Sequence, residues 1–263
     1  MSEGVTLAAG RLLVGDCDLE IVRGGSGRPI LFLHGFHPLD AGSPFLARLA
    51  GAGAVLAPAH PGFGDSPRPD GFETVYDLVQ LYRALLDGLP DETVTLVGAS
   101  FGGWIAAELA AATPRRFDRL VLVDALGVKL GDRETAEIFD VFNRNPREVR
   151  RRAWHDPDRH APDYDALSDD ALTRHARDRE ALCIYGWEPY LYNPRLAAWL
   201  GRIAVPTLVL WGESDGIAAP DYGRAYAARI PGARFETVAA AGHHPEREKP
   251  EALAARILDF LGR

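Results

Sequence analysis

The sequence predicts an α/β protein built on a mostly parallel sheet with helices on both faces. Short apolar runs of strand length alternate along the chain with longer helical patterns, which is typical of such a sheet. The 263 residues suit one domain with an insertion. The composition, 47% hydrophobic and 25% charged, excludes a disordered chain, a collagen-like fibre and a disulfide scaffold.

Eight strands are expected, six of which are buried runs without alternation. These six runs are 29–33, 54–58, 93–98, 119–124, 205–211 and 234–238. Two shorter runs, 12–14 and 19–22, are separated by a Gly-Asp pair and predict an antiparallel hairpin at the edge of the sheet. The helical patterns between the strands are 75–88, 101–113, 220–229 and 250–261.

One long segment interrupts the alternation, because no strand is expected from residue 128 to residue 202. It holds 13 basic and 14 acidic side chains, a higher charged fraction than the chain as a whole. We therefore expect a helical lid at 128–202, inserted into a core formed by 1–127 and 203–263. Most of its aromatic side chains are expected to pack against the core, and Trp187 and Tyr190 are candidates for the lining of a substrate pocket.

Charge and cysteine content limit the possible partners and location. The net charge of −8 argues against nucleic acid as a partner, since phosphate binding needs clustered positive charge. Cys17 and Cys183 are expected to be free thiols in a reducing compartment. Residues 1–15 lack the apolar run of a signal peptide, and no apolar stretch approaches 18 residues, so we expect a cytoplasmic protein without a membrane partner. Nothing in the sequence indicates an oligomeric state.

The clearest local motif is Gly98-Ala99-Ser100-Phe101-Gly102, which follows a predicted strand and precedes a predicted helix. A serine on so sharp a turn has a strained backbone, and glycines two positions to either side give the turn room. The turn would hold the hydroxyl clear of the sheet and aim the start of the helix at a developing oxyanion. Ser100 is therefore the predicted nucleophile.

At this motif the chain resembles the α/β-hydrolase superfamily, in particular its lidded, serine esterase-like branch. The resemblance extends from the predicted hairpin to the last helix and implies an eight-stranded α/β-hydrolase fold with the lid after strand six. The family's chain order of nucleophile, acid and histidine implies His243, in Ala241-Gly242-His243-His244-Pro245, as the base. His244, the less favoured candidate for the base, is expected to face the lid or the substrate.

The acid of the triad has three candidates in the sequence. The resemblance favours Asp215, which ends the turn after strand seven. Asp124, at the end of strand six, is the alternative position known within the fold, and Glu213 is a third choice two residues out of register. Asp215 and Asp124 both lie at carboxyl ends of predicted strands, where sites form in open α/β sheets.

The resemblance also implies an oxyanion hole made of two backbone N–H groups, those of Phe36 and Phe101. Phe36 follows the His-Gly pair at 34–35, where His34 is expected to hold the loop by hydrogen bonding. His37 is a candidate pocket residue. His60 stands where the family more often has an aspartate, which puts in doubt any hydrogen-bond role carried over from that aspartate.

The predicted activity is hydrolysis of small carboxylic esters, without a metal or organic cofactor. A serine nucleophile argues against epoxide hydrolases and haloalkane dehalogenases of this fold, which need a carboxylate. Carbon–carbon bond hydrolases of ring-cleavage products share the serine triad, but their Gly-Pro-Gly-Asn oxyanion loop is missing from residues 36–42. A hydrolase-like ligand receptor with little turnover is a further alternative, against which the complete set of Ser100, Asp215 and His243 counts.

Overall fold

An eight-stranded sheet forms the centre of the computed structural model, which describes residues 5–90, 93–132 and 134–263. Strands β1 and β2 are antiparallel, β2 and β4 are antiparallel, and all other neighbours are parallel. The order across the sheet is β1 (Ala8–Val14), β2 (Cys17–Gly24), β4 (Ala54–Pro58), β3 (Pro29–Leu33), β5 (Val94–Ala99), β6 (Phe117–Val123), β9 (Thr207–Gly212) and β10 (Arg234–Val238). The predicted mostly parallel α/β sheet is confirmed.

The predicted antiparallel hairpin is present, but its strands are longer than the sequence indicates. β1 and β2 pair over seven residues each, from Ala8 opposite Arg23 to Val14 opposite Cys17. Exposed or half-exposed residues occupy most of β1, so its outer part carries no apolar run that would indicate a strand. Of the two hairpin strands, only β1 lies at an edge of the sheet, because β2 also pairs with β4.

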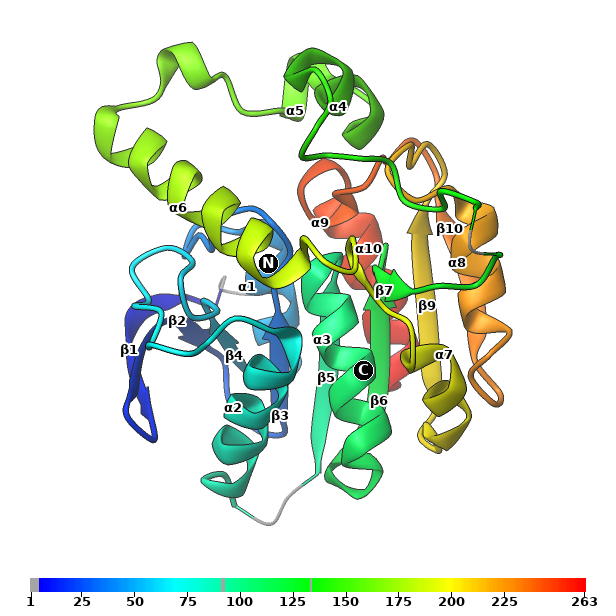
Figure 1. Ribbon diagram of the computed structural model, residues 1–263. Coiled ribbons are helices and arrows are strands. Elements are labelled where there is room, and N and C mark those ends of the chain that lie inside the picture. Colours follow the sequence, from blue (N-terminus) through cyan, green and yellow to red (C-terminus); the bar gives the residue numbers. More distant parts are fainter. Residues whose placement is uncertain (1–4, 91–92, 133) are drawn as a thin grey trace.

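Helices cover both faces of the sheet (Figure 1). One apolar core joins the sheet to α2 (Val75–Asp87), α3 (Phe101–Ala112) and α8 (Pro220–Ala227). A second core on the opposite face joins it to α1 (Pro44–Ala50) and α10 (Pro250–Leu261). The sequence analysis missed α1, a seven-residue helix too short for a clear period, whose first turn is capped by the Ser43 hydroxyl accepting the Leu46 N–H at 3.3 Å.

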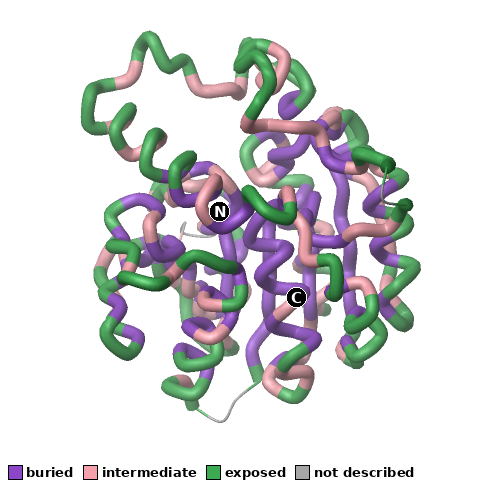
Figure 2. The backbone as a smooth tube through the Cα atoms, viewed as in Figure 1, coloured by how far each residue is buried: buried purple, intermediate pink, exposed green. Residues whose placement is uncertain are grey.

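Residues 128–202 add no strand to the large sheet, and the first helices of this insertion lie across the carboxyl ends of the strands (Figure 1). The outer surface of the insertion is largely exposed (Figure 2). The expectation that it has no strand is wrong in one detail, because β7 (Gly127–Val128) and β8 (Tyr192–Asn193) form a separate parallel pair that is too short to be seen as a periodic pattern. The α-helices of this insertion are α4 (Pro146–Ala153), α5 (Pro157–His160), α6 (Asp169–Gly186) and α7 (Leu196–Trp199).

The remaining helices are short. They are α9 (Pro245–Glu248), η1 (Pro114–Arg116), η2 (Tyr164–Ala166) and η3 (Leu200–Arg202). Among the helices described, none is long and apolar enough to cross a membrane.

Helix α6 is attached to the body of the protein by polar contacts. Arg174 pairs with Glu20 of β2 at 2.9 Å and with Asp65 at 2.5 Å. One turn later, Asp178 Oδ1 accepts the Gly64 N–H at 2.7 Å. The other Asp178 oxygen is buried and has no partner within the described residues, and burial raises the pKa of this carboxyl to about 6.

The raised pKa of Asp178 predicts a pH-dependent gain in stability on substitution with asparagine. Folded Asp178 holds its proton up to a pH of about 6, whereas the unfolded chain loses it near pH 4. Protonation of Asp178 therefore stabilises the folded state fully below about pH 4. This stabilisation is lost as the pH rises through about 6. An asparagine side chain at this position would still accept the Gly64 N–H without burying a charge. We expect Asp178→Asn to raise the free energy of unfolding at pH 7.5 by about 1–3 kcal/mol, with no gain at pH 4.

Thermal and urea unfolding at the two pH values measures this difference, with the exposed Asp170→Asn on the same helix as a control. Destabilisation by Asp178→Asn at both pH values would contradict the prediction.

Candidate active site

Ser100 occupies the sharp turn between β5 and α3 that the sequence predicts. Its backbone angles are φ 51° and ψ −115°, a conformation that side-chain-bearing residues rarely adopt. The turn is held from both sides, since the Ser100 N–H donates to the Val123 carbonyl at 2.8 Å and the Ser100 carbonyl accepts the Leu126 N–H at 3.1 Å. The neighbouring strand β6 therefore fixes the position of the serine.

The glycines around Ser100 are needed for close packing. A Cβ on Gly98 would lie 2.5 Å from the Gly102 carbonyl oxygen, and a Cβ on Gly102 would collide with the carbonyl oxygens of Leu33 and His34. The clearance expected from the sequence motif is present. It also brings the loop after β3 against the serine, because a Cβ on Gly35 would be 3.0 Å from Ser100 Cβ.

Ser100, His243 and Asp215 form one buried hydrogen-bonded chain. Ser100 Oγ lies 2.8 Å from His243 Nε2, and His243 Nδ1 lies 2.8 Å from Asp215 Oδ2. The Asp215 Oδ1 atom accepts the N–H groups of Ile217 at 2.8 Å and Ala218 at 3.1 Å. With its Nδ1 proton directed at the carboxylate, His243 has Nε2 free to accept a proton from the serine hydroxyl.

The loop that carries His243 is fixed by a residue the sequence analysis missed. Buried Glu248 accepts the Gly242 N–H at 2.6 Å through Oε2, and through Oε1 it accepts the N–H groups of His155 and Asp156 at 2.9 and 3.0 Å. Glu248 stands in a run of charged residues that resembles an exposed surface, so no sequence signal distinguishes it. The His243 N–H also donates to the Ala153 carbonyl at 2.7 Å. The insertion thus helps to hold the histidine.

Asp124, the alternative acid, lies beside Asp215 but does not touch the histidine through a hydrogen bond. It is completely buried, its φ is 45°, and its Oδ1 accepts the Gly212 N–H at 2.8 Å. Its other oxygen has no partner among the described residues. Burial and the neighbouring Asp215 charge raise the pKa of Asp124 well above its ordinary value. Both effects favour the protonated form of Asp124, and Asp215 is the carboxyl group hydrogen-bonded to His243.

The other groups near Asp215 do not change this arrangement. Glu213 is exposed and makes no contact with the histidine through its side chain in the described structure. Three possible ligand atoms, one each from Asp124, Asp215 and His243, lie within 4.8 Å of one another, which is close enough to hold a metal ion. However, both nitrogens of His243 and both oxygens of Asp215 already have hydrogen-bond partners, so these groups are arranged for proton transfer.

Two histidines hold the loop that would supply an oxyanion donor. The His60 N–H donates to His34 Nε2 at 3.1 Å, His34 Nδ1 lies 2.7 Å from the Gly35 carbonyl, and the two rings stack with centroids 4.0 Å apart. Burial lowers the pKa of His34 to about 4 and that of His60 well below its ordinary value. Both are neutral loop-holding residues, so His60 has its own hydrogen-bonding role in place of an aspartate.

The predicted oxyanion donors flank this arrangement. Phe36 directly follows the loop residue Gly35 that packs on Ser100. Phe101 is the first residue of α3, and N–H groups in the first turn of a helix have no acceptor within that helix. That these two N–H groups stabilise an oxyanion stays a prediction.

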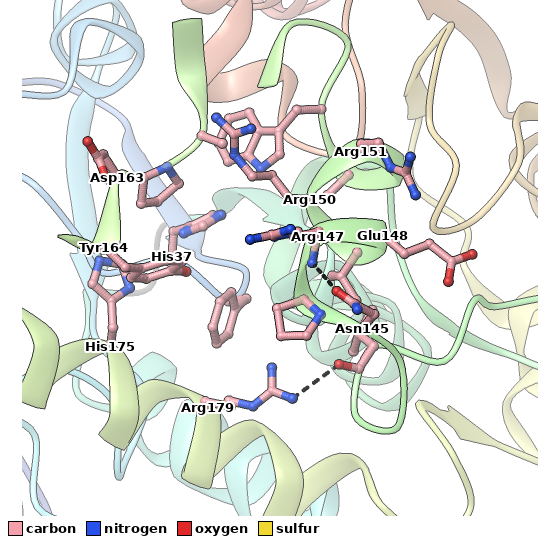
Figure 3. A pocket seen from close by; sticks show the side chains of 18 of the residues that line it. His37, Asn145, Arg147, Glu148, Arg150, Arg151, Asp163, Tyr164, His175 and Arg179 are labelled. Carbon is pink, nitrogen blue, oxygen red and sulfur yellow. Dashed lines mark hydrogen bonds between the residues drawn. The ribbon is translucent and has the colours of Figure 1, made fainter. Parts of the chain in front are cut away.

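A cavity of about 1430 Å³ opens between this site and the insertion (Figure 3). It borders the site through Phe36 and through His244, the neighbour of His243. His37 and His244 line it, and that it takes the substrate stays a prediction. Trp187 and Tyr190 are not among its lining residues.

These two aromatic residues have other surroundings. Trp187 is 59% exposed, with its ring 5.7 Å from that of Phe142. Tyr190 donates through its hydroxyl to the Phe139 carbonyl at 2.8 Å and accepts the Val141 N–H at 2.6 Å. Tyr190 therefore braces the insertion internally, and aromatic content alone does not reveal which side of the insertion faces the cavity.

A model of the alpha/beta hydrolase family matches residues 30–256. The chain belongs to this family. A 2-hydroxymuconate semialdehyde hydrolase of Pseudomonas sp. strain CF600 is 30% identical to this hydrolase over 252 residues, covering 90% of the chain and 88% of the relative.

Solved structures share the fold of this hydrolase. A membrane phospholipase A superposes with a TM-score of 0.80 at 24% identity, covering 98% of this chain and 86% of the other. A carboxylesterase from Bacillus subtilis gives 0.72 at 21% identity, covering 97% and 91%. At these identities the likeness concerns architecture, and chemistry has to be argued from the site.

The site predicts different consequences for its two buried carboxyl groups. Asp215→Asn would remove the charge that holds the Nδ1 proton of His243, so we expect the rate of Ser100 labelling by a fluorophosphonate to fall by about 10²–10⁴-fold. Asp124→Asn would keep an acceptor for the Gly212 N–H and present an amide N–H to Asp215, so we expect a change of about threefold or less.

Mass spectrometry of the labelled serine over time gives both rates, and the exposed Glu213→Gln serves as a matched control. Equal losses in Asp124→Asn and Asp215→Asn would contradict the assignment of the proton to Asp124.

Proposed function

We propose that this hydrolase cleaves carboxylic esters of small molecules through an acyl-enzyme on Ser100. The observation that carries the proposal is the continuous chain of two 2.8 Å hydrogen bonds from Ser100 through His243 to Asp215. Activated serine nucleophiles require such a base and such an orienting group. The insertion would act as a lid, since it lies over this edge of the sheet and contributes the Ala153 carbonyl that holds His243.

In the proposed mechanism, Ser100 Oγ attacks the ester carbonyl while His243 Nε2 takes the hydroxyl proton. Asp215 stabilises the resulting imidazolium, and the N–H groups of Phe36 and Phe101 hold the oxyanion. The alcohol leaves with the proton from His243. Water then attacks the acyl-enzyme by the same route, which frees the acid and restores Ser100.

Carbon–carbon bond hydrolysis is the second candidate, supported by the 30% identical hydrolase of 2-hydroxymuconate semialdehyde. That chemistry uses a serine site of the same composition, so the triad does not separate the two reactions. Residues 36–42, Phe-His-Pro-Leu-Asp-Ala-Gly, differ from the oxyanion loop of these enzymes. This difference favours ester cleavage.

We expect p-nitrophenyl esters of short and medium chain length to be cleaved with measurable turnover. Ser100→Ala and His243→Ala should each lower kcat by about 10⁴-fold or more, because either change removes a group that acts in every step. The assay compares p-nitrophenyl acetate, butyrate, hexanoate and octanoate with 2-hydroxymuconate semialdehyde and a p-nitroanilide.

The relative values of kcat/KM decide among the functions. Faster turnover of the semialdehyde than of every ester would replace ester hydrolysis by carbon–carbon hydrolysis. A single stoichiometric release of p-nitrophenol without turnover would indicate a ligand receptor.

A further inference from the structure

The wall that the insertion contributes to the cavity is rich in arginine. Residues Arg144, Arg147, Arg150 and Arg151 come from α4 and the turn before it, and Arg179 comes from α6. In Figure 3 the guanidinium groups of Arg147 and Arg179 extend into the cavity from its two sides.

Carboxylates compensate only part of this positive wall. Arg150 pairs with Asp158 at 3.1 Å, and Glu148 pairs with Arg152 at 3.4 Å and points away from the cavity centre (Figure 3). Two further acids that line the cavity, at 163 and 165, lie on the segment between α5 and α6.

Arg147 and Arg179 have no carboxylate partner within the described parts of the chain. Arg179 donates only to the backbone carbonyls of Val141 and Phe142, each at 3.3 Å. Arg147 and Arg179 are both exposed and line the cavity, so their guanidinium groups can bind an anion.

The facing wall supplies hydrogen-bonding groups without permanent charge. His37 is 7% exposed, and neither of its ring nitrogens has a partner among the described residues. Burial, together with the nearby His244 and Arg247, lowers the pKa of His37 well below its ordinary value. A buried polar ring without a partner is costly, and a polar ligand group in the cavity would relieve that cost.

We propose that the ester substrate carries a carboxylate remote from its scissile bond, bound by Arg147 and Arg179 with His37 as a hydrogen-bonding neighbour. The proposal rests on the proposed function, because the cavity meets the reactive site at Phe36 and His244. Guanidinium groups match carboxylate geometry and form charge-assisted hydrogen bonds with it. The cavity would thus select among esters by charge as well as by chain length.

The test compares pairs of esters that differ only in a terminal charge. Mono-p-nitrophenyl adipate and p-nitrophenyl hexanoate have the same six-carbon acyl chain. Phenyl hexanoate and 4-carboxyphenyl hexanoate place the charge on the alcohol side instead. We expect kcat/KM to favour the charged member of at least one pair by about tenfold, mainly through a lower KM, and the preference to weaken with added NaCl because the cavity is open.

The double variant Arg147→Gln/Arg179→Gln should reduce that preference about tenfold. Arg177→Gln is the matched control, since Arg177 is exposed on α6 but does not line the cavity, and it should leave the preference as it is. Circular dichroism and thermal unfolding would verify that the variants are folded.

The outcomes separate the two proposals. Cleavage of the neutral esters without preference for a charged partner in either pair would overturn carboxylate recognition while leaving ester hydrolysis in place. A preference that survives the double variant would also overturn it. If no ester of the set is cleaved, ester hydrolysis itself fails.

Discussion

The hydrogen bond between Ser100 Oγ and His243 Nε2 is the constraint on which the rest of the site depends. It joins residues 143 positions apart in the sequence, at a distance of 2.8 Å. A parallel sheet makes this possible, because the segments that follow β5 and β10 both leave at the carboxyl edge. The serine end is fixed by a strained turn that tolerates no Cβ at position 98 or 102, and the histidine end is fixed by Glu248 and the Ala153 carbonyl.

This second attachment makes the insertion part of the site. Glu248 accepts hydrogen bonds from the histidine loop and from the turn after α4 with the same carboxylate. On the far side, Arg174 and Asp178 connect α6 to β2 and to the turn after β4. A movement of α4 would therefore displace the backbone around His243, whereas α6 would have to break two ion pairs and a buried hydrogen bond to move. The insertion is thus attached to the body by polar contacts at both α4 and α6.

The sequence predicted most of the architecture and named the three residues that the structure joins by hydrogen bonds, Ser100, His243 and Asp215, for identifiable reasons. Buried strands such as 29–33 and 54–58 are continuous apolar runs, and Ser100 lies in a motif whose glycines are sterically required. Contacts that depend on the third dimension could not be predicted. Glu248 is indistinguishable from a surface glutamate until the insertion folds over it, and the proton on Asp124 follows only from its burial beside Asp215.

Net charge illustrates the same distinction between composition and arrangement. The chain carries −8 overall, which as a sum argues against anionic partners. At an ionic strength near 0.15 M, however, exposed charges act over about 8 Å, so a ligand in the cavity responds to the few groups that line it. Arg147 and Arg179 face that space without carboxylate partners in the described chain, while Asp215 is hydrogen-bonded to His243 and Asp124 is buried with a raised pKa. The field at the cavity is thus set by the arginines and acids that line it, so a protein of negative net charge can have a cavity wall rich in arginine.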